Sequence, residues 1–389
     1  MANSELPDRP SYREDFEIAI VCALPVEFDA VALMIHPFWD HDGDFYGRAN
    51  GDQNTYSTGR IGNYDVVLTL LPNIGKVSTA GAAASLRASY SQLKMVILAG
   101  ICGGVPGVDS QREMLLGDVI ISKQVIQYDI GRQYTSHFEI RDSTHDVLGR
   151  PNRDIRTLVN SFETSHGRRW LQQETAQFLL QLQEKARSLD SEILYQYPGS
   201  KEDKLFDADY IHRHRTPTTC DCLSLSRACN VAIEASCDEL LCDVSYLIKR
   251  DRIEEIRQQE RSLRTGAEVT NTACNPAIFV GLVGSGDTVM KSGEERDMIA
   301  AKHKIIAFET EGAGLWDEVP CIVVKGVCDY ADSHKNKRWQ PYAAATAAAA
   351  VKALLKRYIK TDKPPNRIQS SISGVQTGAS RQSSNAYCK

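Results

Sequence analysis

Carboxylates follow two short apolar runs in the last third of the chain. The run 305–308 is followed by Glu309 and Glu311, and the run 320–327 is followed by Asp329. Both runs are typical of strands that are buried on both faces. Because ligands of open α/β sheets bind outside the carboxyl ends of strands, we predict that Glu311 and Asp329 lie side by side at such a site. Taken singly, these carboxylates are more typical of ion pairs or helix caps.

Strands and helices alternate through the rest of the chain. The apolar patterns predict strands at 18–22, 66–71, 95–99, 119–122 and 278–283, and helices at 28–35, 77–90, 312–316 and 343–359. Such alternation indicates a three-layer α/β/α fold around a mixed, mostly parallel central sheet. We expect one domain over 15–361 with a charged, mainly helical insertion at about 137–272, in which 170–189 and 240–263 have helical periodicity. Residues 1–14 and 362–389 have the composition of disordered tails.

Composition excludes several classes of protein. The 389 residues carry a net charge of −5, which argues against nonspecific nucleic-acid binding. The sequence has no apolar leader and no run of 18 apolar residues, so we expect no membrane span, no membrane partner and a cytoplasmic or nuclear location. Several of the 11 cysteines lie within predicted strands, which is typical of buried thiols in a reducing compartment.

Cysteines and histidines also gather in the insertion. They are His212, His214, Cys220, Cys222, Cys229, Cys237 and Cys242. Thiolate and imidazole are zinc ligands. The spacing matches no common zinc finger, however, and Cys229 and Cys237 fall at intervals that suit helix packing. We therefore favour packing and predict no metal.

Seven short motifs, in this order, resemble the purine/uridine phosphorylase superfamily, and most closely its methylthioadenosine/S-adenosylhomocysteine nucleosidases. The motifs are IVCALPVE (20–27), NIGKV (73–77), AGICGGV (99–105), LGDVIIS (116–122), GSGD (284–287), FETE (308–311) and CDYAD (328–332). The insertion and the segment 332–340 are similar to nucleoside-phosphorylase-like domains of filamentous fungi, which are often fused to sensor modules. We expect no such module in this chain.

The resemblance implies roles for three acids. Glu311 matches the carboxylate that binds the ribose 2′ and 3′ hydroxyls, and Asp329 matches the general acid that protonates the purine at N7. Glu27 matches the general base that activates water, although the first turn of a helix also favours a glutamate on electrostatic grounds. Glu309 is interpreted as structural. Further substrate-binding residues implied by the motifs are Thr310, Phe308, Val289, Met290, Gly103, Cys102, Ser285 and Arg132, the last of which either pairs with a 5′-phosphate or faces solvent.

The first loop favours hydrolysis over phosphorolysis. Phosphorylases of this superfamily hold phosphate with arginines, whereas this loop offers Glu27, and a carboxylate repels phosphate. The resemblance therefore implies a purine nucleosidase, with adenine the favoured base, that needs no cofactor and forms a homodimer or larger homo-oligomer. A phosphate-dependent purine nucleoside phosphorylase and a non-catalytic nucleoside-sensing module are the alternatives. The loop around Gly100, Gly103 and Gly104 is not a dinucleotide fingerprint, because the required spacing is missing.

Overall fold

The computed structural model describes residues 9–360, apart from 42, 44, 108–111, 142–146, 216–219, 221, 223–227 and 265–274. The chain divides into a compact unit of residues 1–357 and a second of 358–389, and the fold below is that of the first. The predicted tail at 362–389 lies outside the described residues. In the predicted tail at 1–14, the carbonyl of Pro10 accepts a hydrogen bond from the Tyr46 hydroxyl at 2.9 Å. No helix in the described part of the chain combines the length and apolar character needed to cross a bilayer.

Eight strands form one mixed sheet, as the alternating pattern predicted. The order is β10-β5-β8-β9-β4-β1-β3-β2, and β10 also pairs with β4, so that five strands close a ring of pairings. The strands are β1 (Ile18–Cys22), β2 (Tyr56–Ile61), β3 (Tyr64–Leu70), β4 (Met95–Gly104), β5 (Val119–Gln127), β8 (Ile278–Ser285), β9 (Ile305–Glu309) and β10 (Cys321–Asp329). A separate hairpin pairs β6 (Gly131–Gln133) with β7 (Phe138–Ile140).

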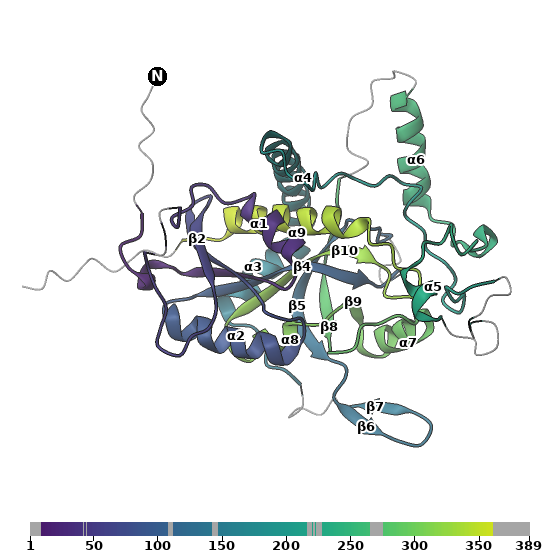
Figure 1. The fold of residues 1–389 in the computed structure, drawn as a ribbon, viewed down its shortest axis with the longest axis horizontal. Coiled ribbons are helices and arrows are strands. Elements are labelled where there is room, and N and C mark those ends of the chain that lie inside the picture. The colour runs from purple at the N-terminus through teal and green to yellow at the C-terminus, as the bar shows by residue number, and fades with distance from the viewer. Residues whose placement is uncertain are drawn as a thin grey trace, which may run out of the picture. The chain divides into compact units, whose positions relative to one another are not determined.

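Helices cover both faces of the sheet. In Figure 1, α1 (Pro25–Ala32) and α9 (Trp339–Arg357) lie above the sheet, and α2 (Lys76–Ser89) and α8 (Gly312–Trp316) lie below it. The alanine-rich α9 approaches β10 so closely that a Cβ on Gly326 would overlap the carbonyl of Ala343. Small residues on both elements therefore allow this close contact.

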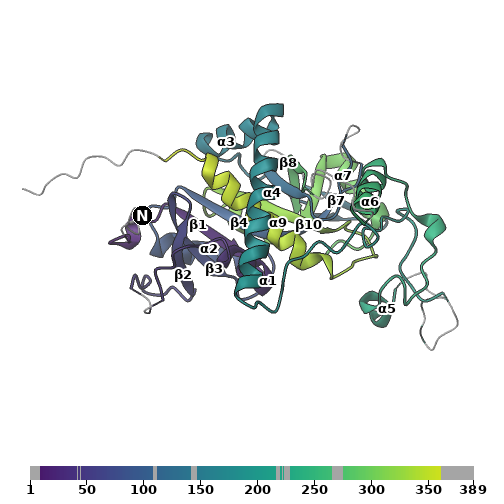
Figure 2. The same ribbon diagram turned by 90° about the horizontal axis from the view of Figure 1, so that it is seen from above.

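The segment predicted to be an insertion, about 137–272, contributes three long helices and the connections between them. The long helices are α3 (Arg153–Glu163), α4 (Ser165–Ser188) and α6 (Asp251–Arg264), and the short ones are α5 (Asn230–Glu234) and η2 (Val244–Tyr246). Figure 2 shows α4 crossing over α9. The remaining elements of the unit are η1 (Arg13–Asp15) and α7 (Gly293–His303).

Two predictions of local structure were wrong. The helix predicted over 240–263 begins only at Asp251, because the side chain of Glu113, far away in sequence, accepts hydrogen bonds from the amides of Asp251 and Arg252 at 3.0 and 2.8 Å and so caps that end. The predicted glycine loop at 100–104 is part of β4. There β4 pairs with β10 on one side and with β9 on the other, and these partners come from distant parts of the chain.

Candidate active site

The ends of β4, β9 and β10 converge at Gly103. This residue pairs with Asp329 in the parallel ladder to β10 and with Phe308 in the antiparallel ladder to β9. A Cβ at this position would lie 2.9 Å from the Asp329 Oδ1 and from the Ala331 Cβ, so only glycine allows this approach. Pairing thus brings Asp329 and the segment after Phe308 to one place.

Glu27 lies in the first turn of α1 and is 2 % exposed. Its Oε2 accepts hydrogen bonds from the amides of Ala23 at 2.8 Å and Leu24 at 2.9 Å, and its Oε1 accepts one from the Ile101 amide at 2.7 Å. Because a carboxylate offers about four lone-pair positions, these bonds fix its orientation and leave about one position open.

Two neighbours define the surroundings of Glu27. A Cβ on Gly100 would overlap the Glu27 carboxylate, so β4 admits this side chain only because residue 100 is glycine. Burial raises the pKa of Glu27, and the charge of Lys325 opposes that rise. The carboxyl of Glu27 is therefore held in a dry environment close to a cation.

Lys325 and Glu311 form a buried ion pair. The Lys325 Nζ lies 3.3 Å from the Glu311 Oε2, and the two side chains are 1 % and 4 % exposed. The hydroxyl of Thr310 donates to the other oxygen, Oε1, of Glu311. Burial lowers the pKa of Lys325, but the charges of Glu27, Glu311 and Glu309 outweigh it, so the pKa is raised overall. One ammonium ion thus stands among three carboxylates.

Glu309 and Ser285 hold the start of α8. The Glu309 carboxylate accepts hydrogen bonds from the amides of Glu311 at 3.0 Å and Gly312 at 2.8 Å, and the Ser285 Oγ accepts one from the Ala313 amide at 2.9 Å. Burial raises the pKa of Glu309 to about 6, and the charge of Glu311 adds to this effect. These bonds fix the backbone on which Glu311 stands.

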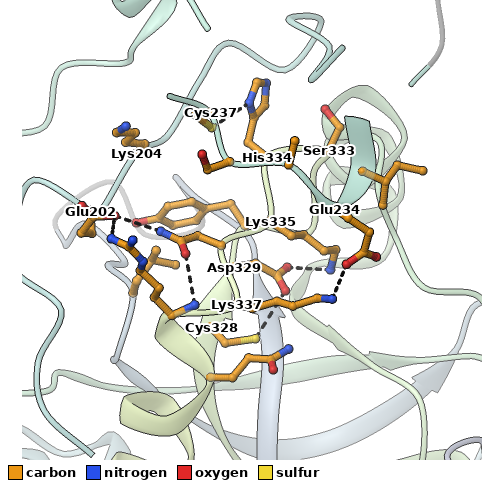
Figure 3. Close-up of a pocket in the computed structure, with 18 of the residues that line it drawn as sticks. Glu202, Lys204, Glu234, Cys237, Cys328, Asp329, Ser333, His334, Lys335 and Lys337 are labelled. Atoms are coloured by element: carbon orange, nitrogen blue, oxygen red, sulfur yellow. Dashed lines mark hydrogen bonds and ion pairs between the residues drawn. The ribbon is translucent and has the colours of Figure 1, made fainter. Parts of the chain in front are cut away.

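Asp329 lies at the end of β10, where the loop that follows folds back over it. Its Oδ1 accepts hydrogen bonds from the Ala331 amide at 2.8 Å and from the Lys335 Nζ at 2.9 Å. Its Oδ2 accepts one from the Cys328 thiol at 3.3 Å. Figure 3 shows Lys335 reaching back to Asp329. Burial lowers the pKa of Lys335, but the Asp329 charge outweighs it, so the pKa is raised and Lys335 is an ammonium ion at neutral pH.

A small apolar cavity adjoins this acid. Its walls include Tyr128, Phe308 and Met290 from three different segments, and further lining residues are Gly103, Thr288, Val289, Glu309, Thr310, Ala331 and Lys335. The rings of Tyr128 and Phe308 meet edge to face with centroids 5.2 Å apart. The volume is about 50 Å³, whereas ligand pockets usually start at about 300 Å³. A ligand of nucleoside size does not fit this cavity unless the Lys335 loop or another wall moves. Asp329 itself lines a second cavity, of about 300 Å³, on the other side of that loop.

The structure brings most of the candidate site residues together, with Arg132 as the exception. Cys102 is buried in β4 next to Gly103, and burial raises the pKa of its thiol. Arg132 is exposed on the β6–β7 hairpin, which projects beyond the layers of the sheet (Figure 1). The acids, the cavity and Ser285 thus lie in one region, and Arg132 on the β6–β7 hairpin lies outside it.

Sequence reasoning missed the two lysines of this region. Lys325 interrupts an otherwise apolar strand, and a lone charge in a buried strand was the signal that could have revealed it. Lys335 had no such signal, because lysines are common in polar loops. Its role depends on the loop that returns it to Asp329.

A third lysine joins three loops near the same edge of the sheet. The Nζ of Lys76 lies 2.7 Å from the Asp129 Oδ2, and the amide of Lys76 donates to the Asp287 Oδ1 at 2.8 Å. The amide of Asp287 in turn donates to Asp129 at 2.8 Å. This cluster ties the segment after β5 to the segment after β8.

Comparison with known proteins confirms the resemblance inferred from the motifs. Residues 17–171 match the model of the Phosphorylase superfamily. A curated relative, a nucleotide-binding leucine-rich repeat (NLR)-like protein from Hyaloscypha variabilis, is 28% identical over 354 residues, which are 89% of this chain. The chain spans about 30% of the length of that relative.

The comparison with solved structures gives a nucleosidase and a hydrolase among its matches. A methylthioadenosine/S-adenosylhomocysteine nucleosidase from Colwellia psychrerythraea, in complex with adenine, has a TM-score of 0.49 and 16% identity, with 89% of this chain and 97% of that chain covered. Futalosine hydrolase from Helicobacter pylori has a TM-score of 0.48 and 13% identity, with 88% and 98% covered. The match to the Phosphorylase superfamily model thus covers residues 17–171, and the described chain forms a mixed α/β sheet with helices on both faces.

Proposed function

We propose that this chain hydrolyses the N-glycosidic bond of a purine nucleoside or nucleotide and releases the free base, with adenine the favoured base. The observation that carries the proposal is the setting of Glu27. Three backbone amides hold its carboxylate, about one acceptor position stays open, and a buried cation lies nearby. A carboxylate fixed in this way can accept a proton from one water and direct that water at the anomeric carbon.

Glu311 suits the binding of the sugar. Thr310 and Lys325 each engage one of its oxygens, so each oxygen keeps an acceptor position for a ribose hydroxyl. When the glycosidic bond loosens, positive charge develops on the sugar. The carboxylates of Glu27, Glu309 and Glu311 outnumber the one ammonium of Lys325, and this excess of negative charge favours such a transition state.

Asp329 suits the leaving base. Lys335 and Ala331 fix its Oδ1, whereas a thiol, which is a weak donor, is the partner of its Oδ2. In the proposed reaction substrate binding separates Asp329 from Lys335, and Asp329 takes up a proton from solvent and gives it to N7 of the purine. The bond between the base and C1′ then breaks and the hydroxide part of water bonds to C1′. Glu27 takes the remaining proton of that water and returns it to solvent. The apolar walls formed by Tyr128 and Phe308 would contact the base.

The charges also favour water over phosphate as the nucleophile. Lys325 is the buried cation beside Glu27, and carboxylates already surround it. An incoming phosphate would meet those carboxylates, with no buried arginine beside it among the described residues of this cluster. Hydrolysis is therefore favoured, and an experiment must distinguish it from the alternative, phosphorolysis.

The test is base release from adenosine, inosine, methylthioadenosine and ATP in phosphate-free buffer made with H₂¹⁸O, followed by chromatography and mass spectrometry. We expect free base from at least one substrate and ¹⁸O at C1 of the sugar. Product that forms only after phosphate is added, as a sugar 1-phosphate, would replace hydrolysis by phosphorolysis. No release from any substrate, with or without phosphate, would contradict both reactions.

A further inference from the structure

Eight cysteine and histidine side chains of the described residues gather into two groups of four. The two-histidine cluster consists of His212, Cys237, Cys242 and His334, and the three-cysteine cluster consists of His214, Cys220, Cys222 and Cys229. In each cluster the four candidate ligand atoms lie within 4.8 Å of one another. All five cysteines are reduced in the structure. Cys₂His₂ and Cys₃His are the ligand sets of structural zinc sites.

The distances in the two-histidine cluster fit one tetrahedral ion. Zinc bonds of about 2.3 Å to sulfur and 2.0–2.1 Å to nitrogen place a sulfur and a nitrogen about 3.5 Å apart. The Nδ1 of His212 lies 3.4 Å from the sulfur of Cys242 and 3.8 Å from that of Cys237. The Nδ1 of His334 lies 3.5 and 3.9 Å from the sulfurs of Cys237 and Cys242, respectively. All four pairs thus surround a space of the right size.

The three-cysteine cluster has the same dimensions. The Nδ1 of His214 lies 3.3 Å from the sulfur of Cys220, 3.5 Å from that of Cys222 and 3.7 Å from that of Cys229. His212 and His214 are separated by one residue and serve different clusters, so this short extended segment joins the two clusters.

Contacts outside the clusters orient the ligands as metal sites require. The far nitrogen of His212 lies 2.9 Å from the Ala235 carbonyl, and that of His334 lies 2.7 Å from the Tyr210 carbonyl. A carbonyl only accepts, so both rings carry a proton on Nε2, which makes Nδ1, the nitrogen that faces the two sulfurs, the one available to a metal. In the other cluster the amide of Cys229 donates to the sulfur of Cys222 at 3.2 Å, a bond that favours a thiolate.

Packing alone gives a weaker account of these cysteines. Among the described residues, the buried apolar core beside the three-cysteine cluster consists of Cys222, Ala232 and Leu240. Beside the two-histidine cluster, Phe206 and Tyr210 stack on His334. Among the described residues of 205–247, regular structure is limited to α5 and η2, which have five and three residues. A segment with so small a core usually needs a disulfide or a metal to fold.

We propose that this chain binds two zinc ions, one in each cluster, and that the ion of the two-histidine cluster fixes the loop that carries Lys335 over Asp329. His334 precedes Lys335 directly, and the Lys335 Nζ lies 2.9 Å from Asp329. Figure 3 shows Cys237 beside His334 above the Asp329 carboxylate. The amide of His212 also donates to the Ser333 Oγ at 3.0 Å. Through this ion the insertion would position one end of the candidate active site.

Metal analysis of the full chain, purified from zinc-supplemented cells without chelators, tests the proposal. We expect two zinc ions per chain, and a cobalt-substituted sample should show the strong visible bands of tetrahedral sulfur–nitrogen coordination. Cys237→Ser and Cys220→Ser should each remove one ion. Cys321→Ala, which changes a cysteine buried in β10, should retain both. Fewer than two ions in the parent, or two ions in both serine variants, would overturn the proposal.

A second measurement keeps the test informative if a variant fails to fold. Thiol modification of the native parent protein, with released zinc detected by a coloured chelator, should release two ions per chain. Hydrogen exchange should then rise in the peptide 329–337 of Cys237→Ser more than in that of Cys220→Ser, because only the first change frees His334. Equal exchange in the two variants would overturn the link to the Asp329 loop. None of these readouts depends on catalysis, so they are independent of the proposed hydrolysis.

Discussion

The two sides of the candidate site are built in different ways. The strand-built side consists of Glu27, Glu309, Glu311 and Lys325, whose positions follow from strand ends and backbone amides. The loop-built side consists of Asp329 at the end of β10 and the loop that returns Lys335 to it. The strand-built side has little freedom once the sheet forms, whereas the loop-built side also depends on the insertion through His334. Substitutions on the strand-built side should therefore mainly lower the free energy of unfolding, and substitutions on the loop-built side should mainly lower the rate of base release.

The largest effect on activity is expected at Asp329. Asp329→Asn keeps an oxygen that can accept the Ala331 amide but removes the proton donor, so base release should fall by about 10²–10⁴-fold. The change is isosteric but removes the charge that pairs with Lys335, so the melting temperature should fall by a few degrees while the protein stays folded.

The control for this variant is Asp317→Asn, which changes an exposed aspartate just after α8 and should keep parental activity. Base-release rates and thermal melting are measured on all three proteins. An Asp329→Asn variant as active as the parent would remove Asp329 from the proposed reaction.

The largest effect on stability is expected at Lys325. Lys325→Met leaves the buried carboxylates of Glu27 and Glu311 without their cation, which should lower the free energy of unfolding by about 3–5 kcal/mol. Denaturant titration measures the change. The matched control is Lys356→Met, which breaks the exposed Lys356–Glu174 pair at 2.7 Å and should cost less than about 1 kcal/mol. Equal losses in the two variants would contradict the assignment of stability to the strand-built side.

The smallest predicted effect is a pH dependence on the strand-built side. The pKa of Glu309 is raised to about 6 in the folded protein, by burial and then by the Glu311 charge, whereas an unfolded glutamate titrates near about 4.3. The folded state therefore holds this proton more tightly. The stabilisation is fully present below about pH 4.3 and is lost as the pH rises through about 6.

In the parent protein this loss should lower the free energy of unfolding by an amount on the order of 2 kcal/mol between pH 4 and 7. Glu309→Gln has no such proton to lose, so its free energy of unfolding should not show this fall. Denaturant titrations between pH 4 and 7 measure it, and Glu318→Gln, next to the surface residue Arg87, is the control. Parallel pH profiles for Glu309→Gln and the parent would show that Glu309 does not carry this dependence.

The order of strands and helices could be predicted from the sequence, because strands that are buried on both faces consist of continuous runs of apolar residues. The run 18–22 coincides with β1, and acidic residues were expected at the ends of β9 and β10, where they stand. Local pattern failed at Gly100–Gly104, where glycines indicated a loop. The segment is a strand because distant partners pair with it and because Gly100 gives the Glu27 carboxylate room.

The segment 137–272 shows where prediction from sequence patterns fails. The spacing of its cysteines and histidines matched no familiar finger, and the eighth member, His334, lies 92 residues after Cys242, beyond the insertion. No local pattern reveals such a set, because its members are joined by the path of the chain. For the same reason, the sequence did not indicate that Lys335 pairs with Asp329: the path of the loop brings them together.

The sequence by itself determined the α/β fold and the acids that can carry its chemistry, since residue type and hydrophobic period are local properties. Only the tertiary structure decided which cations stand beside those acids and which thiols meet which imidazoles. Charges and ligands act over a few ångströms of space, whatever the number of residues between them.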